Sequence, residues 1–202
     1  MKKQDTIVIG IMEKDSNRNT IKFIKNLLIS LDYRLYYANK KESIIGLNTE
    51  GINLLIFDIN SSNMDLYGSW DIEFDILIHN FMEDHHYQND IFLKQFSDCK
   101  YYIINSDDKN WVNLPLKSLK GIVINYGFNN KAALTISSYD INQVIRASIC
   151  LQREIITTQD NRIEPFEFMA KINSHNKGNI YPVLAASALT LVLNHKYDHI
   201  YL

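Results

Sequence analysis

The chain has 202 residues, 46% of them hydrophobic, which is enough for one sizeable core and predicts a single domain. The formal net charge of -2 and the pI near 6.3 give no basic excess, so they argue against a nucleic-acid partner. Two cysteines without metal-ligand spacing, no signal peptide and no apolar run long enough to span a membrane predict a cytoplasmic location.

Six short apolar runs in residues 1–128 are typical of buried parallel strands. They span residues 6–11, 33–38, 52–59, 74–81, 100–106 and 121–127. Between the first two runs, Ile21, Ile24, Leu27, Leu28 and Leu31 recur at helical spacing. This pattern predicts an amphipathic helix that packs on a sheet, and hence a β-α-β unit.

From residue 129 the pattern changes. Residues 132–140, 147–157 and 161–172 alternate β-branched and polar residues, which predicts antiparallel strands with a turn around Asp160 and Asn161. An Ala/Leu-rich stretch with Pro182 near its start predicts a largely buried closing helix. The expected fold class is therefore α/β, with helices flanking a mainly parallel sheet (1–128), a small antiparallel β appendage (129–175) and the closing helix (176–202).

The first strand and helix enclose the turn EKDSNR, residues 13–18. A strand, a turn and a helix in this order often begin a nucleotide-binding domain, but a phosphate-binding turn carries glycines and a Gly-Lys-Ser/Thr ending. Glu13 and Asp15 would each repel a triphosphate by about 4 kcal/mol at close range in a partly desolvated site. Lys14 and Arg18 would offset part of this repulsion. Phosphoryl transfer by the usual route is therefore not expected.

Polar residues close four of the apolar runs, at residues 58–62, 79–86, 105–108 and 125–130. The carboxyl ends of parallel strands meet at one rim, where ligands bind. We expect carboxylates, imidazoles and amides there, although a polar loop without a ligand is equally compatible with the pattern. His79, His85 and His86 could chelate a transition metal. Asp107 and Asp108 could simply begin a turn.

In their order, these motifs resemble the central ATPase domain of the Mur ligases and of their relatives, the folylpolyglutamate synthases. That family has Glu-Val-Ser-Ser, Thr-Asn-x-x-x-Asp-His and Asn-Ala-Asp-Asp stretches. They are matched in part by DINSS (58–62), HNFMEDH (79–85) and NSDD (105–108), and GNIYPVLAA (178–186) is similar to the start of a family helix. The resemblance spans nearly the whole chain and implies a P-loop-NTPase-like fold. It covers the central domain alone, since nothing looks like the family's flanking domains.

The resemblance implies a role for four residues. Asn80 and Asn105 match the asparagines that hydrogen-bond the adenine of ATP or another adenine nucleotide, and Asp58 and His85 match residues that help hold Mg²⁺. Amides and carboxylates suit these two roles. In the degenerate phosphate loop, Glu13 and Ser16 replace glycines, Asn17 replaces the phosphate-binding lysine and Arg18 replaces the magnesium-binding threonine. Lys14 and Arg18 remain as the cations for a nucleotide, and no catalytic residue is assigned.

The function expected from these observations is that of a binding or regulatory protein linked to cell-wall precursor metabolism, without ATPase or ligase activity. Its partner would be another protein or a second copy of the chain. The alternative is an active ATP-dependent amide ligase of the Mur or folylpolyglutamate synthase type. It would hold phosphates through Lys14 and Arg18, or rely on a partner chain for the other domains. A third hypothesis is adenine recognition without a triphosphate.

Overall fold

A computed structural model describes residues 5–14, 19–41, 43–60, 63, 72–88, 90–94, 96 and 98–202. Its strands are β1 (Asp5–Met12), β2 (Arg34–Asn39), β3 (Ile44–Thr49), β4 (Ile52–Ile59), β5 (Ile76–His79), β6 (Tyr101–Asn105), β7 (Ile122–Gly127), β8 (Leu134–Ile141), β9 (Ile145–Leu151), β10 (Ile155–Ile156), β11 (Arg162–Ile163), β12 (Phe166–Ile172) and β13 (His199–Tyr201). The α-helices are α1 (Asn19–Ser30), α3 (Asp90–Lys94) and α4 (Ile180–Val192). Four 3-10 helices are η2 (Asp84–Gln88), η3 (Trp111–Asn113), η4 (Leu116–Ser118) and η5 (Lys177–Asn179).

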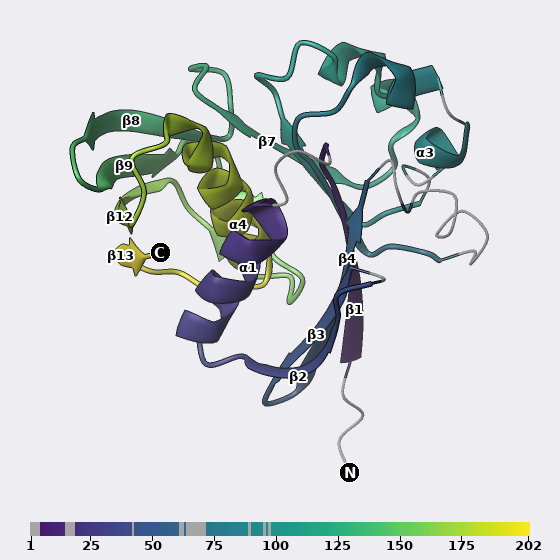
Figure 1. Ribbon diagram of the computed structural model, residues 1–202, viewed down its shortest axis with the longest axis horizontal. Helices are drawn as coiled ribbons and strands as arrows, with labels where there is room; N and C mark the ends of the chain where they lie inside the picture. Colours follow the sequence, from purple (N-terminus) through teal and green to yellow (C-terminus); the bar gives the residue numbers. More distant parts are fainter. Residues whose placement is uncertain are drawn as a thin grey trace.

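Eleven strands form one mostly parallel sheet in the order β13-β12-β9-β8-β7-β6-β5-β1-β4-β3-β2 (Figure 1). Its centre, from β4 through β1, β5 and β6 to β7, is entirely parallel. The predicted α/β class is therefore confirmed. The antiparallel strands β8, β9 and β12 continue this sheet at one side, and only β10 and β11 pair in a separate two-stranded sheet.

The sequence pattern does not predict β3, and the predicted position of β2 beside β1 is therefore wrong. The predicted β-α-β unit joins β1 to β2, but β4 and β3 lie between these two strands in the sheet. The reason is a tight antiparallel hairpin between β3 and β4, in which Thr49 pairs with Ile52. Gly51 stands in its turn with a φ of 95°, which glycine adopts without strain.

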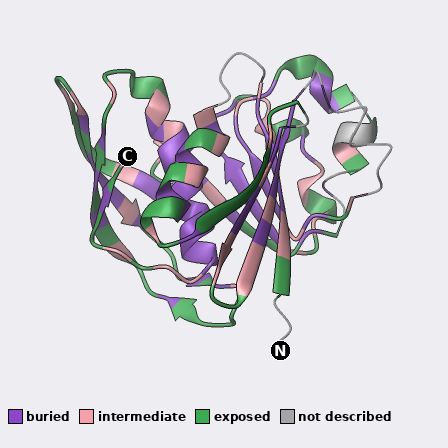
Figure 2. Cartoon of the chain, turned by 60° about the horizontal axis from the view of Figure 1, so that its bottom comes forward, coloured by how far each residue is buried: buried purple, intermediate pink, exposed green. Residues whose placement is uncertain are grey.

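Helices cover the sheet on both faces. α1 and α4 pack against each other on one face, and α3 lies toward the other (Figure 1). Almost every residue of α4 is buried, because α1 covers it on one side and the sheet on the other (Figure 2). This explains why α4 is apolar all round, whereas α1 has a polar face. In the described part of the chain, no helix has the length and apolar character needed to cross a bilayer.

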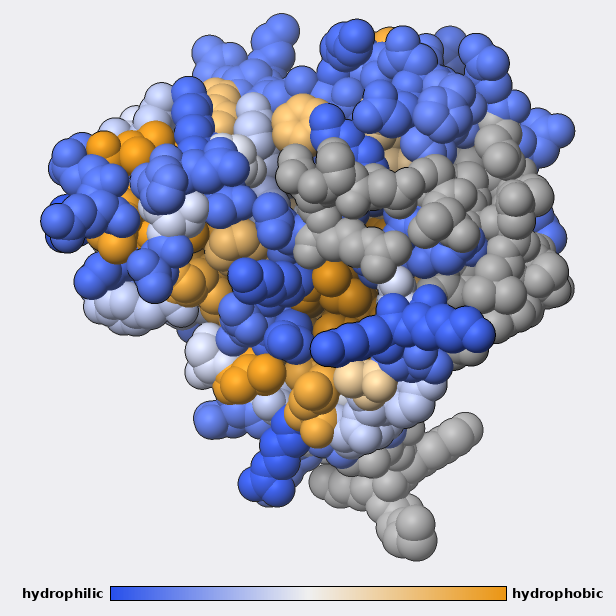
Figure 3. Space-filling view, in the orientation of Figure 1, coloured by the Kyte–Doolittle hydropathy of each residue, from blue (hydrophilic) through white to orange (hydrophobic). Residues whose placement is uncertain are grey.

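One edge of the sheet stays open to solvent. β2 is the last strand on its side, and Leu35, Tyr36 and Tyr37 are 44%, 54% and 41% exposed. Ile29 at the end of α1 is also exposed, and Figure 3 shows hydrophobic residues where α1 ends and β2 begins. Tyr36 covers Gly46 of β3, where an added Cβ would lie 2.6 Å from the tyrosine ring.

Candidate functional site

The carboxyl ends of three parallel strands meet the starts of two helices at one rim of the sheet. In register, Met12 at the end of β1 pairs with His79 of β5, which pairs with Ile104 of β6. A hollow of about 260 Å³ lies at this rim, between the start of α1 and the start of α4. Its lining includes Glu13, Lys14, Asn19, Asn80, Asn179 and Tyr181. This is the position at which open parallel sheets bind ligands.

Glu13 directly follows β1, and only 2% of its surface is exposed. Its two carboxyl oxygens lie 3.2 and 3.3 Å from the backbone nitrogen of Thr20, the second residue of α1, and accept its N–H. Burial raises the pKa of Glu13 to about 8, the hydrogen bond from Thr20 lowers it in part, and the nearby Asp58 carboxylate raises it. A mostly protonated carboxyl therefore occupies the positive end of α1 at neutral pH.

Asn80 and Asn105, the predicted adenine-binding residues, are joined in one chain of hydrogen bonds. Asn80 Nδ2 donates to Thr20 Oγ1 at 2.8 Å, and Asn105 Nδ2 donates to Asn80 Oδ1 at 3.3 Å. Asn105 Oδ1 then accepts the backbone N–H of Asp107 at 3.0 Å. Asn80 lines the hollow, whereas Asn105 lies behind it with no exposed surface. Their roles toward adenine stay predictions.

Asp107 fastens three segments to one another. Its Oδ2 accepts hydrogen bonds from the backbone N–H of Phe128 and from the hydroxyl of Tyr181, and its Oδ1 accepts one from the amide of Asn129. Gly127 makes room for this carboxylate, because an added Cβ would lie 2.7 Å from it. Asp107 thereby ties the loop after β7 and the start of α4 to the end of β6.

Asp108 completes a buried network with His79 and Tyr87. Its Oδ2 accepts the Met82 N–H at 3.2 Å and the Tyr87 hydroxyl at 3.1 Å, and its Oδ1 accepts the Asn110 N–H. His79 Nε2 lies 2.6 Å from the Tyr87 hydroxyl oxygen. Burial lowers the pKa of His79 well below its usual value, and Asp108 opposes this shift only in part. His79 is therefore neutral at pH 7.

Asp58 and His85, the predicted magnesium-binding residues, line different hollows. Asp58 is buried beside Ser43, and His85 is exposed with its ring centroid 4.0 Å from that of His86. Among the residues that the structure describes, no three His, Cys, Asp or Glu side chains gather closely enough to hold a metal ion. Mg²⁺ is usually held by one or two carboxylates together with phosphates and waters, so the magnesium-binding roles stay predictions.

The structure describes one of the two predicted phosphate-binding cations. Lys14 lines both the hollow beside Asn80 and a larger one of about 650 Å³ beside His85. Its backbone N–H donates to the carbonyl oxygen of Phe81 at 3.0 Å, which holds the segment after β1 against the segment after β5. The remaining predicted rim and loop residues lie outside the described residues: Arg18, Asp15, Ser16, Asn17, Ser61 and Ser62.

Sequence reasoning misses several residues of this site. The rings of Tyr181 and Phe81 meet edge to face, with centroids 4.7 Å apart, and both line the hollow. Asn19 Nδ2 donates to Asn179 Oδ1 at 3.3 Å, which joins the starts of α1 and α4. The asparagines that precede α4 were a usable signal, since polar residues at a helix start often face a ligand. Nothing in the linear sequence placed that helix start opposite α1.

Comparison with solved structures reveals the fold to which this geometry belongs. MurF ligase from Thermotoga maritima, solved in complex with ADP, superposes with a TM-score of 0.63 and 12% identity, over 96% of this chain and 47% of the ligase. The murein peptide ligase Mpl from Psychrobacter arcticus 273-4 gives a TM-score of 0.62 and 9% identity, over 95% of this chain and 44% of that chain. No family model and no curated protein sequence matches. The chain therefore has a Mur-ligase-like fold and spans about half the length of these ligases.

Proposed function

We propose that this Mur-ligase-like domain lacks ATPase and ligase activity and serves in the cytoplasm as a binding or regulatory protein linked to cell-wall precursor metabolism. The observation that carries the proposal is the Glu13 carboxyl at the start of α1. In phosphate-binding turns, the N–H groups of the following helix receive the phosphate. Here a side chain of the protein itself accepts the Thr20 N–H, so a phosphate would have to displace it.

The charge at this position supports the same conclusion. Below a pH of about 8 the Glu13 carboxyl is mostly neutral and contributes no attraction to a phosphate. Above that pH it is an anion next to Asp58, and both carboxylates repel one. Lys14 is the one cation in the described lining of the hollow. Phosphoryl transfer relies on several positive groups around the transferred phosphate, and among the described residues that line this hollow Lys14 alone is positively charged.

The hollow is suited to a small polar group without net charge. Amides from Asn19, Asn80, Asn176 and Asn179 line it, together with the rings of Phe81 and Tyr181. Amides present donors and acceptors side by side, and aromatic rings favour flat ligands. We propose that the occupant is a segment of a protein partner, or of a second copy of the chain, that offers amide or hydroxyl groups.

The main test is calorimetric titration of the protein with Mg-ATP. We expect no detectable heat at roughly millimolar nucleotide, because the Glu13 carboxyl occupies the helix start and Lys14 is the one cation among the described lining residues. Glu13→Gly serves as the matched variant. It removes the carboxyl and restores a glycine, so any gain in ATP binding would identify Glu13 as the obstacle.

One of the structurally similar ligases was solved with ADP, so retained nucleotide binding is the hypothesis that this titration must exclude. Low-micromolar binding of Mg-ATP that is lost on Lys14→Ala or Arg18→Ala would overturn the proposal in favour of an active ligase. Adenosine and AMP are titrated in parallel. If adenosine or AMP binds and the binding weakens in Asn80→Ala or Asn105→Ala, adenine recognition persists without a triphosphate. If neither substitution changes the binding, that hypothesis is rejected.

A further inference from the structure

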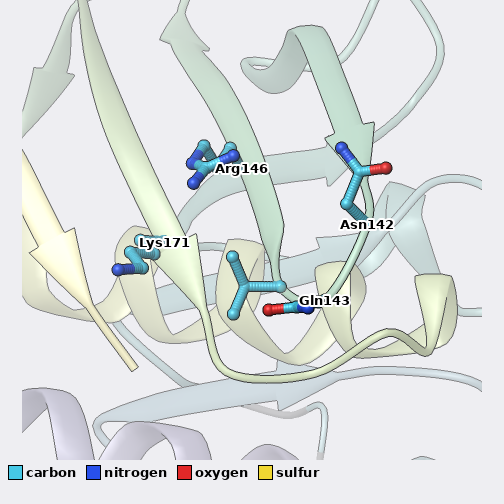
Figure 4. Close-up of a pocket in the computed structure, with 5 residues that line it drawn as sticks. Asn142, Gln143, Arg146 and Lys171 are labelled. Carbon is cyan, nitrogen blue, oxygen red and sulfur yellow. The ribbon is translucent and has the colours of Figure 1, made fainter.

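Another polar hollow lies at the turn between β8 and β9, away from the candidate site. Its volume is about 570 Å³, and its lining consists of Asn142, Gln143, Val144, Arg146 and Lys171. Figure 4 shows Arg146 and Lys171 on neighbouring strands, with Asn142 and Gln143 at the adjoining turn. None of these residues lines the hollow beside Glu13.

The strand register places the two cations directly opposite each other. Arg146 of β9 pairs with Lys171 of β12. The flanking residues of both strands, such as Ala147 and Ala170, are buried in the core that contains α4, so the two cations project from the other face of the sheet. Opposed residues in an antiparallel pair have Cβ atoms roughly 5 Å apart, and like charges at that position destabilise a sheet unless an anion balances them.

The carboxylates nearest to this pair accept hydrogen bonds from neutral side chains. Asp140 is the register partner of Arg146 on β8, but its Oδ2 accepts the Asn142 amide at 2.7 Å. Glu167 of β12 accepts hydroxyl hydrogen bonds from Ser148, at 2.6 Å, and from Ser137.

Neither Arg146 nor Lys171 forms an ion pair with a described carboxylate. Other surface cations of the chain do, for example Arg162, whose Nη1 lies 3.0 Å from Glu154 Oε1. The N–H groups of Arg146 and Lys171 are therefore available to a ligand, while the Asp140 carboxylate in the same row of the sheet offsets part of their charge.

We propose that this hollow binds a doubly charged oxyanion, namely the phosphate monoester group of a small molecule. The guanidinium of Arg146 offers two parallel N–H donors to two oxygens of one phosphate, and the ammonium of Lys171 adds a second charge from the next strand. Asn142 and Gln143 add amide donors from the turn. The proposal is independent of the function proposed above, because the two hollows share no residue.

The test is a ¹H–¹⁵N NMR titration of the full chain with inorganic phosphate and with glycerol 3-phosphate, at constant ionic strength. We expect saturable shifts at residues 142–146 and at Lys171. Arg146→Gln and Lys171→Gln should each weaken the binding by about ten-fold, because each removes a charge-assisted hydrogen bond. Lys117→Gln is the matched control, since it removes an equally exposed positive charge elsewhere and should change nothing.

Four outcomes would overturn the proposal. Shifts that stay linear up to tens of millimolar phosphate would indicate screening without a site. A loss on Lys117→Gln as large as that on Arg146→Gln would indicate a general charge effect. Saturable shifts around Lys14 and Asn80 instead would move phosphate binding to the candidate site, and would count against the function proposed for that site as well. A parallel titration with succinate separates phosphate groups from dicarboxylates, and tighter binding of succinate would reject the phosphate class.

Discussion

Glu13→Gln is expected to stabilise the protein, with a gain that grows as the pH rises from about 5 to about 8. In the folded chain the pKa of Glu13 is raised from its ordinary value to about 8, chiefly by burial. Between these two pH values the unfolded chain has lost the proton and the folded chain still holds it. The stability that the protonated carboxyl contributes is therefore fully present at low pH and is lost as the pH rises through the folded pKa.

Glutamine keeps an oxygen that can accept the Thr20 N–H, but it never ionises. Each unit of pKa shift corresponds to about 1.4 kcal/mol, so we expect the variant to gain on the order of 5 kcal/mol in the free energy of unfolding at pH 8 and above. Near pH 4 the two proteins should be equally stable. Urea denaturation at a series of pH values measures this difference, with the exposed Glu164→Gln as a control whose profile should follow the wild type. A constant difference across the pH range would show that the carboxyl of Glu13 is not the titrating group.

His79 also makes the free energy of unfolding depend on pH, at lower pH values and in the direction opposite to Glu13. Because burial lowers its pKa, the unfolded chain binds the histidine proton more readily than the folded chain does. Stability from this group is present above the ordinary histidine value of about 6.5 and is lost as the pH falls through the lower folded pKa. Between about pH 5 and pH 6.5 the effects of Glu13 and His79 oppose each other in the wild type. In Glu13→Gln only the histidine effect remains, so stability should rise with pH over that interval.

Asp108→Ala should destabilise the fold by roughly 3–5 kcal/mol, because it removes the common acceptor of a buried network. The N–H of Met82 and the hydroxyl of Tyr87 would lose their partner inside the protein, where water does not replace it. The Asn110 N–H would lose its acceptor at the turn. Burial makes this loss larger than that of a surface carboxylate.

The free energy of unfolding in urea measures the effect of Asp108→Ala. The control is Asp84→Ala, which removes an exposed carboxylate from the 3-10 helix that carries Tyr87 and should cost less than about 1 kcal/mol. Equal losses in the two variants would mean that the buried hydrogen bonds of Asp108 contribute no more than a surface charge. Amide hydrogen exchange locates the damage, and we expect it at the segment after β5 and not in α4.

The parallel centre of the sheet and both main helices were predictable from local pattern. Short apolar runs correspond to β1, β4, β5, β6 and β7, and helical periodicity corresponds to α1. β3 was missed because Gly46 interrupts its short run of hydrophobic residues. Its pairing with β2 and β4 gives it a strand structure that its own residues signal weakly. β13 is only three residues long and exists through its register with β12.

The residue types of the site could be predicted from the sequence, but their positions relative to one another could not. Residue type and position after a strand identified Glu13, Lys14 and Asn80, and the structure brings all three to one hollow. The same reasoning treated Asn105 as equivalent to Asn80. In the structure the two amides differ, because Asn80 lines the hollow whereas Asn105 is buried behind it. Asp58 and His85 lie in different hollows, a separation that their sequence motifs do not express.

The groups at the rim of the sheet could be read from the amino-acid pattern, because strand period and residue type are local properties. The same pattern also established that the first turn carries acids where a phosphate-binding turn carries glycines. The folded arrangement was needed to establish three further facts: the Glu13 carboxyl lies at the start of α1, the start of α4 closes the hollow, and Arg146 lies opposite Lys171. These three facts depend on contacts between residues far apart in the chain or across a turn, and such contacts are selected by the packing of the whole core.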